Sequence, residues 1–559
     1  MGEMADVHTR HQHEKSSPET NVTIHHAECI LQIPLSAFPS TQLQSASIIP
    51  SMNSPKLLLV LLGFSLSNSE LSAADKPNIV LFLVDDMGAM DTSLPFLTDE
   101  KGTPVKHPLN RFYRTPNMER LAAQGSRFSQ FYAQSVCSPT RISIMTGQNA
   151  TRHKTTNWIK PKSNNRSKFT PANWNWTGLT KSSLTLAHLL AQSGYQNIHV
   201  GKGHFGPYDH EGQNPLNLGF HVNIGGDSIG QPGSYYGKRN YGNKVKGQDE
   251  KNTYGVSHLT DYHGSDTFLT EALTIEAKKA VSQSTEEKKP FYLYMAHYAL
   301  HAPFNSDTRF AKNYLKSGKP KNAQAYATLV EGMDKSLGDL LDHLNALGVA
   351  EDTLVLFLGD NGGDAPLGGA HDYGSSAPLR GKKGAHYEGG TRAPFIAAWA
   401  KPNPANPHQK RLPISQGTTQ TQLATVMDLF PTILNLVGQE IPKDHPIDAH
   451  DLKAQFNGTP NPDRPEIFLS HFPHEHRSDY YTGFRHGDWK LIYHYPVGKQ
   501  TRRYELFNLR TDPFEKADLS TKNPAELKRL FSEMTAHLKA QGALFPVAAD
   551  GRKITPVAP

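Results

Sequence analysis

Two uninterrupted apolar runs in the chain each end in a pair of polar residues. The run NIVLFLV leads into Asp85 and Asp86, and the run TLVLFLG leads into Asp360 and Asn361. Apolar runs of this length that are rich in β-branched residues are typical of strands buried on both faces. The pattern therefore predicts two core strands with polar residues directly after them.

Helical segments alternate with such strands. The segment PNMERLAAQ follows Thr115, has Pro116 at its first helical position and stops before Gly125. Further helices are expected at residues 183–194, 323–347 and 426–438. Further strands are expected at residues 196–200, 291–296 and 392–400. This alternation predicts an α/β fold with a large, mainly parallel sheet between helices, in which ligands bind at the carboxyl ends of the strands.

The pattern changes after about residue 440. The segments HGDWKLIYHY and RRYELFNLRTDPFE predict antiparallel strands joined by a turn, and a last helix is expected near residues 525–539. We therefore expect a large main domain at residues 75–440 and a small antiparallel α+β subdomain at residues 441–559.

A short apolar run near the start of the chain predicts export. The run LLLVLLGF follows Met52 and Lys56 and leads to the small residues Ser72, Ala73 and Ala74. A basic start, an apolar core and a small-residue exit are typical of a signal peptide, here at residues 52–74. The alternative is a buried strand or helix of the fold.

Residues 1–51 are polar, rich in histidine and without periodicity. They are interpreted either as a gene-model extension ahead of a true start at Met52, or as a disordered arm. An exported product would be periplasmic or extracellular, or lysosomal or secretory in a eukaryotic host. No run approaches the roughly 20 apolar residues of a membrane span.

Composition adds two constraints. The formal net charge of the 559-residue chain is +6, which favours anionic substrates, but no nucleic-acid-binding module is recognisable. The chain has two cysteines, Cys29 and Cys137, and only Cys137 lies beyond the predicted signal peptide. A lone cysteine in an oxidising compartment is a liability unless it is buried or chemically used.

Cys137 stands in the stretch SVCSPTRISIMTG. Pro139 suits the first turn of a helix that starts near Cys137, where free N–H groups and the helix dipole favour anions. Arg141 follows four residues later and can share the face of Cys137. The arrangement predicts an oxyanion site, and the alternative is a structural cysteine beside an ordinary surface arginine.

The two polar pairs at the strand ends predict a cation site. Asp85, Asp86, Asp360 and Asn361 offer oxygen ligands, which suit Ca²⁺ first and Mg²⁺ second. Carboxylates gathered without a cation would be costly to bury. The alternative is that each pair caps a helix or a turn.

Four further residues follow strands or lie in glycine-rich loops: Lys202, His204, His301 and Lys383. Each alone is more often a solvated side chain. Together they supply cations for the non-bridging oxygens of a sulfate or phosphate ester and imidazoles for proton transfer.

With these residues in place, the chain resembles the type I sulfatases of the alkaline-phosphatase-like superfamily. The resemblance covers nearly the whole chain after the predicted signal peptide. It rests on the segments PNIVLFLVDDMG, TPNMERLAAQGSRFSQFYAQSVCSPTRISIMTG, GYQNIHVGKGHFG, LGDNGG, LRGKKGAHYEGGTRAPFI, DLFPTILNLVG and GDWKLI…YELFNLRTDPFEKADL. One departure is Gly203, where the family usually has tryptophan.

The resemblance implies that Cys137 is converted by a maturation enzyme to Cα-formylglycine. Its hydrate would attack the sulfate ester, the alcohol would leave, and loss of the second hydroxyl proton would expel sulfate. The implied metal ligands, which hold calcium, are Asp85, Asp86, Asp360, Asn361 and the matured Cys137.

The resemblance also implies roles for the remaining residues. Arg141 and Lys202 stabilise the diol, and His204 is the base that releases sulfate. His301 and Lys383 hold the sulfate and assist the leaving oxygen.

The sequence leaves other functions open. One alternative is a phosphatase or phosphonate hydrolase of the same superfamily, and another is a non-catalytic, calcium-stabilised protein that binds anionic glycans. The expected substrate is a sulfated small molecule or glycan. Aromatic residues in loop-like segments could stack on sugars or pack in the interior; these are Trp174, Trp176, Tyr235, Tyr236 and Tyr241. The segment HFPHEHRSDYY could border the pocket.

Overall fold

The computed structural model describes residues 76–243, 252–367 and 375–559. The predicted signal peptide and residues 1–51 lie outside the described residues. The described residues belong to one compact unit. Among them, no helix combines the length and the apolar character needed to cross a membrane.

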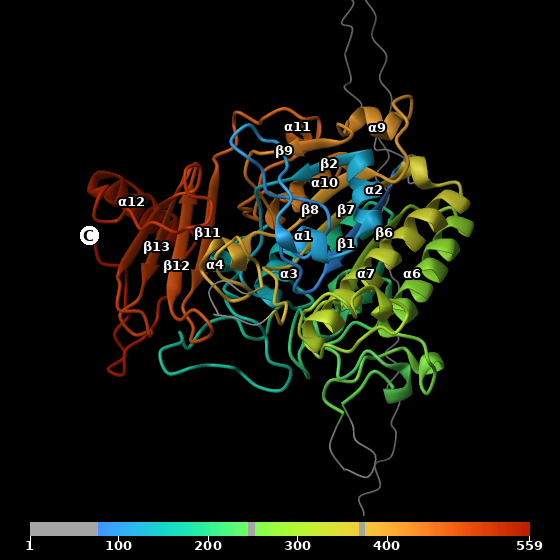
Figure 1. Ribbon diagram of the computed structural model, residues 1–559, viewed down its shortest axis with the longest axis horizontal. Coiled ribbons are helices and arrows are strands. Elements are labelled where there is room, and N and C mark those ends of the chain that lie inside the picture. Colours follow the sequence, from blue (N-terminus) through green and yellow to red (C-terminus); the bar gives the residue numbers. More distant parts are fainter. Residues whose placement is uncertain (1–75, 244–251, 368–374) are drawn as a thin grey trace, which may run out of the picture. The chain divides into compact units, whose positions relative to one another are not determined.

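A mixed sheet of eight strands forms the centre of this unit (Figure 1). In spatial order the strands are β5 (Val222–Ile224), β4 (Gln196–Gly201), β6 (Phe291–His297), β1 (Asn78–Val84), β7 (Thr353–Gly359), β8 (Phe395–Trp399), β2 (Gly125–Phe128) and β9 (Thr418–Gln420). The strands from β5 to β7 are parallel, β8 runs antiparallel to both of its neighbours, and β9 is parallel to β2. The predicted fold class is confirmed.

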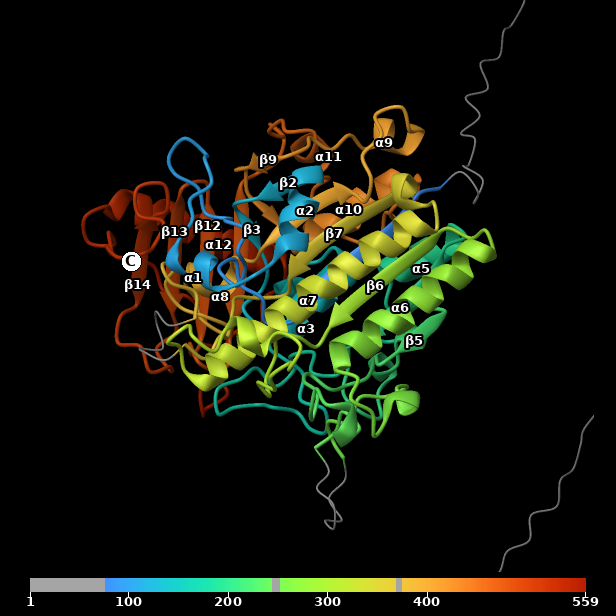
Figure 2. The same cartoon turned by 45° about the vertical axis from the view of Figure 1, so that its right-hand side comes forward.

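Helices cover both faces of this sheet. On one face lie α2 (Pro116–Gln124), α6 (Leu269–Glu286) and α7 (Lys321–Ala346), with α6 and α7 side by side (Figure 2). On the other face lie α3 (Cys137–Thr146), α5 (Leu186–Gln192) and α10 (Leu429–Val437). Successive residues of β1 enter the two cores in turn, because side chains alternate across a strand.

A second, antiparallel sheet is built by the C-terminal residues. Its strands are β11 (Ile467–Phe472), β12 (Tyr481–His486), β13 (Trp489–His494) and β14 (Tyr504–Asn508). The apolar side of α12 (Pro524–Ala540) packs on this sheet. The sequence predicted β13, β14 and α12 but neither β11 nor β12. The domain boundary at residue 440 stays a prediction.

The remaining elements are short. They are α1 (Pro108–Phe112), β3 (Phe131–Tyr132), α4 (Ala150–His153), α8 (Glu388–Thr391), α9 (Pro407–Arg411), β10 (Ala424–Thr425) and α11 (Lys453–Phe456). The predicted helix at 183–194 begins later than expected, because Thr185 is its cap and accepts a hydrogen bond from the His188 N–H at 3.1 Å.

Candidate active site

Four neighbouring parallel strands deliver most of the predicted site residues to one edge of the sheet. Asp85 and Asp86 follow β1, Asp360 and Asn361 follow β7, Lys202 follows β4, and His301 follows β6. In the sheet these strands stand in the order β4, β6, β1, β7. Their carboxyl ends therefore meet at one place, as expected for a ligand site in an open α/β sheet.

A cluster of acidic groups forms the base of the site. Ligand atoms of Asp85, Asp86, Asp360 and Cys137 lie within 4.8 Å of one another, and all four residues are buried. The Cys137 thiol is 3.5 Å from Asp85 Oδ1, to which it donates. Since α3 begins at Cys137, the free N–H groups of its first turn also face this region.

Asn361 tests whether these residues fit a cation. Its Nδ2 donates to Asp86 Oδ1 at 3.0 Å, whereas its Oδ1 is buried and has no hydrogen-bond partner. An unpaired buried carbonyl oxygen beside three carboxylates is costly unless a cation is bound. The donor set fits a divalent metal ion, and its oxygens suit a hard cation.

Arg141 and Lys202 bind the acidic groups from the buried side of the site. Arg141 Nε and Nη2 donate to Asp360 Oδ2 at 3.0 and 2.8 Å, and its Nη1 donates to the Lys202 carbonyl at 2.9 Å. Lys202 Nζ lies 2.7 Å from Asp85 Oδ2. Both cations are fully buried. They neutralise two of the carboxylates and fix where those carboxylates lie.

Lys383 and His301 stand on the accessible side of Asp86. The Lys383 ammonium is 2.6 Å from Asp86 Oδ1, and His301 Nε2 is 3.7 Å from Asp86 Oδ2. The side chains of Lys383 and His301 are 10% and 16% exposed, whereas those of Arg141 and Lys202 are 0% exposed. An anion from solvent would therefore meet Lys383 and His301 first.

His204 is buried, and a hydrogen bond to the backbone of Ile159 holds its ring. Its Nε2 donates to the Ile159 carbonyl at 2.6 Å, and its Nδ1 is buried without a partner. The Ile159 N–H in turn donates to Ser138, the neighbour of Cys137. Burial and the nearby Lys202 charge hold the pKa of His204 well below its usual value, so the ring is neutral with one free lone pair.

The other titratable groups respond to the same crowding. Burial raises the pKa of Asp360 to about 6, and the repulsion from Asp85 adds to that effect. Burial would raise the pKa of Asp86 as well, but electrostatic interactions with Lys383 and His301 outweigh this effect. They hold the Asp86 pKa well below its usual range. Burial raises the pKa of the Cys137 thiol to about 12 and lowers that of His301 to about 4. At neutral pH the unmodified Cys137 is a thiol and His301 is uncharged.

The structure adds a residue that the sequence did not single out. Arg477 makes a two-point ion pair with Asp364 at 2.7 Å, and its Nη1 donates to the Lys383 carbonyl at 3.2 Å. It lies in the HFPHEHRSDYY segment, so this segment does border the site. Nothing local in the sequence signals the contact, because Arg477 and Asp364 are 113 residues apart.

The structure shows how the aromatic residues of the loop-like segments and Gly203 are packed. Trp174, Tyr235 and Tyr241 are buried, so these three residues pack in the interior and do not offer sugar-stacking surfaces. A Cβ at Gly203 would lie 3.2 Å from the Asp227 carbonyl. The backbone near Asp227 therefore leaves little space for a side chain at position 203.

Comparisons with known proteins agree with this geometry. A family model described as Sulfatase matches residues 77–439, more than half of the chain. The chain belongs to the sulfatase family. A second model, described as N-sulphoglucosamine sulphohydrolase, C-terminal, matches residues 383–543. The resemblance to sulfatases of the alkaline-phosphatase-like superfamily is confirmed.

Individual relatives support the same assignment. N-acetylgalactosamine-6-sulfatase of Mus musculus is 32% identical over 406 residues, which is 71% of this chain and 69% of the relative. A sulfatase of Formosa agariphila is 26% identical over 82% of this chain and 87% of its own length. The crystal structure of Ps i-CgsB superposes with a TM-score of 0.66 at 26% identity, over 83% of this chain and 93% of that one. The protein is thus a sulfuric ester hydrolase.

The orphaned oxygen of Asn361 leads to a prediction about metal binding. Losing even an outer partner of a metal ligand costs about 10- to 100-fold in affinity. We expect Asn361→Leu, which would remove a direct ligand if Asn361 Oδ1 binds the ion, to weaken divalent-cation binding by about tenfold or more. Calorimetric titration of chelator-treated protein measures this.

The matched control is Asn435→Leu on the exposed side of α10. This variant should bind the cation as the unaltered protein does. Equal affinities for the two variants would show that Asn361 does not ligate the ion.

Proposed function

We propose that this sulfatase hydrolyses sulfate esters of sugars through Cys137 matured to formylglycine, with a calcium ion in the acidic cluster. The observation that carries the proposal is the position of Cys137. It stands at the first residue of α3, within hydrogen-bond reach of Asp85 and among the three carboxylates. This is where a side-chain oxygen at position 137 would meet both a cation and an incoming anion.

The proposed ligands of the metal are Asp85, Asp86, Asp360 and Asn361, joined by the matured side chain at position 137. Calcium is favoured over magnesium because calcium accepts six to eight oxygen ligands in flexible geometry, whereas magnesium requires near-ideal octahedral geometry and keeps several waters. The calcium ion would polarise the hydroxyl oxygen that matured residue 137 supplies as the nucleophile.

Lys383, as a cation, and His301, as a neutral imidazole, would receive the sulfate. Lys383 and His301, as the more exposed pair, are placed to hold non-bridging oxygens of the ester and to assist the leaving oxygen. Arg141 and Lys202 would stabilise the nucleophilic side chain from the buried side. Fixed donors of this kind need no reorganisation as charge develops, which is why they lower the barrier.

The proposed base is His204. Its Nε2 proton is committed to the Ile159 carbonyl, which leaves Nδ1 as the acceptor. A neutral imidazole whose tautomer is fixed in this way can take the proton whose removal releases sulfate from residue 137.

The substrate class is inferred from a relative. The mouse relative is named as a sulfatase of N-acetylgalactosamine, and a sulfated sugar or glycan is the corresponding proposal for this chain. Maturation of Cys137 requires a modifying enzyme as a partner. The predicted signal peptide at residues 52–74 supports the proposal that the enzyme acts outside the cytoplasm.

The nucleophile is tested first by substitution. Cys137→Ala should abolish sulfate release from an aryl sulfate, because alanine cannot be matured to an aldehyde. The melting temperature should stay close to that of the unaltered protein, since the change removes one small side chain. Sulfate release and calorimetric melting are the two measurements.

An active Cys137→Ala protein would contradict the mechanism. The unaltered protein should also be assayed with a matched pair of aryl sulfate and aryl phosphate. A higher kcat/KM for the phosphate would favour the phosphatase alternative within the same superfamily.

Lys383 gives a second prediction. Removing one donor to the developing negative charge costs about 100- to 1,000-fold in rate. Lys383→Met keeps the length of the side chain and should lower kcat/KM for an aryl sulfate by that factor. Steady-state kinetics measure it.

Lys401→Met is the matched control. Lys401 follows β8, its side chain is 56% exposed, and it pairs with Glu351. Its kcat/KM should not change. If Lys383→Met were as active as this control, Lys383 would not contact the reacting sulfate.

A further inference from the structure

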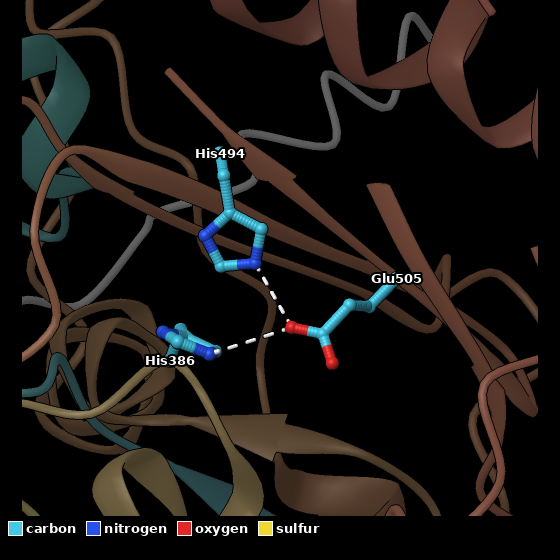
Figure 3. Close-up of side chains that lie close together, drawn as sticks. All are labelled: His386, His494 and Glu505. Carbon is cyan, nitrogen blue, oxygen red and sulfur yellow. Dashed lines mark hydrogen bonds and ion pairs between the residues drawn. The ribbon is translucent and has the colours of Figure 1, made fainter. Parts of the chain in front are cut away.

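A second cluster of metal-ligand side chains lies outside the acidic cluster. It consists of His386, His494 and Glu505 (Figure 3). His386 follows the segment that carries Lys383, His494 ends β13, and Glu505 lies in β14. Each imidazole directs its Nε2 toward the same carboxylate oxygen, Glu505 Oε1, at 3.7 Å from His386 and 2.9 Å from His494.

His386 is the unusual member of the cluster. It is 3% exposed, yet neither of its ring nitrogens has a hydrogen-bond partner. Burial, reinforced by His494 and Lys490, holds the pKa of His386 well below its usual value, so the ring is neutral and carries no charge to pair with Glu505. A buried polar group in this state costs free energy unless another partner binds it.

The donor types and their arrangement suit a metal ion. Burial raises the pKa of Glu505, but hydrogen bonds from His494 and Tyr387 and the charge of Arg380 outweigh it, so the pKa is lowered and the carboxylate stays ionised. Metals bind neutral imidazole and ionised carboxylate. The two imidazole rings are nearly perpendicular, at 81°, with centroids 4.8 Å apart, so that both nitrogens reach one point without stacking.

We propose that His386 Nε2, His494 Nε2 and Glu505 Oε1 bind a zinc ion. Two imidazoles and one carboxylate are a common zinc ligand set, and water completes a site of three protein ligands. Imidazole ligands favour zinc over calcium or magnesium, which select oxygen. The site is thus separate in chemistry as well as in place from the acidic cluster.

Neighbouring residues supply outer support and a route for the ion. The Tyr387 hydroxyl donates to both oxygens of Glu505, at 3.0 and 3.1 Å, which fixes the carboxylate. His386 lines a cavity together with Arg380, Lys382, Arg477 and Gln500. The cavity gives space for a water ligand and for passage of the ion.

Three positively charged side chains near the cluster, those of Arg380, Arg502 and Lys490, oppose a dication, and each of them pairs with a carboxylate. Arg380 Nη1 is 3.7 Å from Glu505 Oε2, the oxygen not used for zinc. Lys490 lies 3.0 Å from Glu388 and 2.7 Å from Glu515. The negative charge that faces the proposed ion comes from Glu505 Oε1, the oxygen toward which both imidazoles point.

A bound zinc ion would join two parts of the fold. His386 is three residues after Lys383, whereas His494 and Glu505 belong to the C-terminal sheet. The ion would clip the Lys383 segment to that sheet and raise the melting temperature. This claim stands independently of the proposed sulfatase mechanism, because it concerns ligand binding at another site.

The test uses the full chain with calcium in excess, so that the acidic cluster is occupied. Zinc is titrated in, unbound zinc is removed by gel filtration, and retained zinc is counted by elemental analysis. We expect one retained zinc ion per chain. Its X-ray absorption fine structure should show two imidazoles, which the acidic cluster cannot supply because its proposed ligands include no histidine.

Variants locate the ion. Glu505→Gln and His386→Gln should each weaken zinc binding about tenfold or more, and the zinc-induced rise in melting temperature should be lost. The matched control is His486→Gln, which breaks the partly exposed pair between His486 of β12 and Glu533 of α12 and should keep both effects. A wild-type protein that retains no zinc, or zinc without imidazole scattering, overturns the proposal even if a variant fails to fold. Equal zinc affinity of the folded variants and the control overturns it as well.

Discussion

The burial of three carboxylates at one edge of a sheet is the constraint on which the site depends. Asp85, Asp86 and Asp360 are at most 1% exposed, and burial, reinforced by repulsion from Asp85, raises the pKa of Asp360. Protein cations offset part of this cost from two sides. Arg141 and Lys202 do so from the buried side, and Lys383 does so from the accessible side. A metal ion would relieve the remaining cost of burying these carboxylates and would also bind the unpaired oxygen of Asn361.

The same constraint explains why a second sheet is needed. Lys383 comes from a long segment between β7 and β8, and it must be held over Asp86. Arg477, between β11 and β12, donates to the Lys383 carbonyl and pairs with Asp364. Farther along, Lys490 of β13 pairs with Glu388 of α8. The C-terminal residues thus position part of the site in addition to forming their own core.

How much the sequence predicted follows from how local each signal is. The strands β1 and β7 were readable because each is a continuous apolar run, and their order in the sheet placed Asp85 and Asp360 together. The helix α6 was missed because glutamate, lysine and threonine interrupt its apolar positions. The strand β12, Tyr481–His486, was missed because YTGFRH has too few apolar residues to stand out.

Contacts that depend on tertiary folding could not be predicted. The support of Lys383 by Arg477 joins residues 94 positions apart, and the burial of Trp174 and Tyr235 reflects packing against distant segments. His386, His494 and Glu505 likewise come together only when the two sheets form. Residue type and spacing were informative for the chemistry of the acidic cluster, because its ligands are tied to strand ends.

The central claim is that Cys137 serves as the precursor of an aldehyde. The most direct test is the mass of the peptide that contains residue 137, taken from protein made in its own host. The account predicts a peptide in which the thiol has been replaced by the aldehyde or its hydrate. An unmodified cysteine in a preparation that hydrolyses sulfate esters at full rate would contradict it.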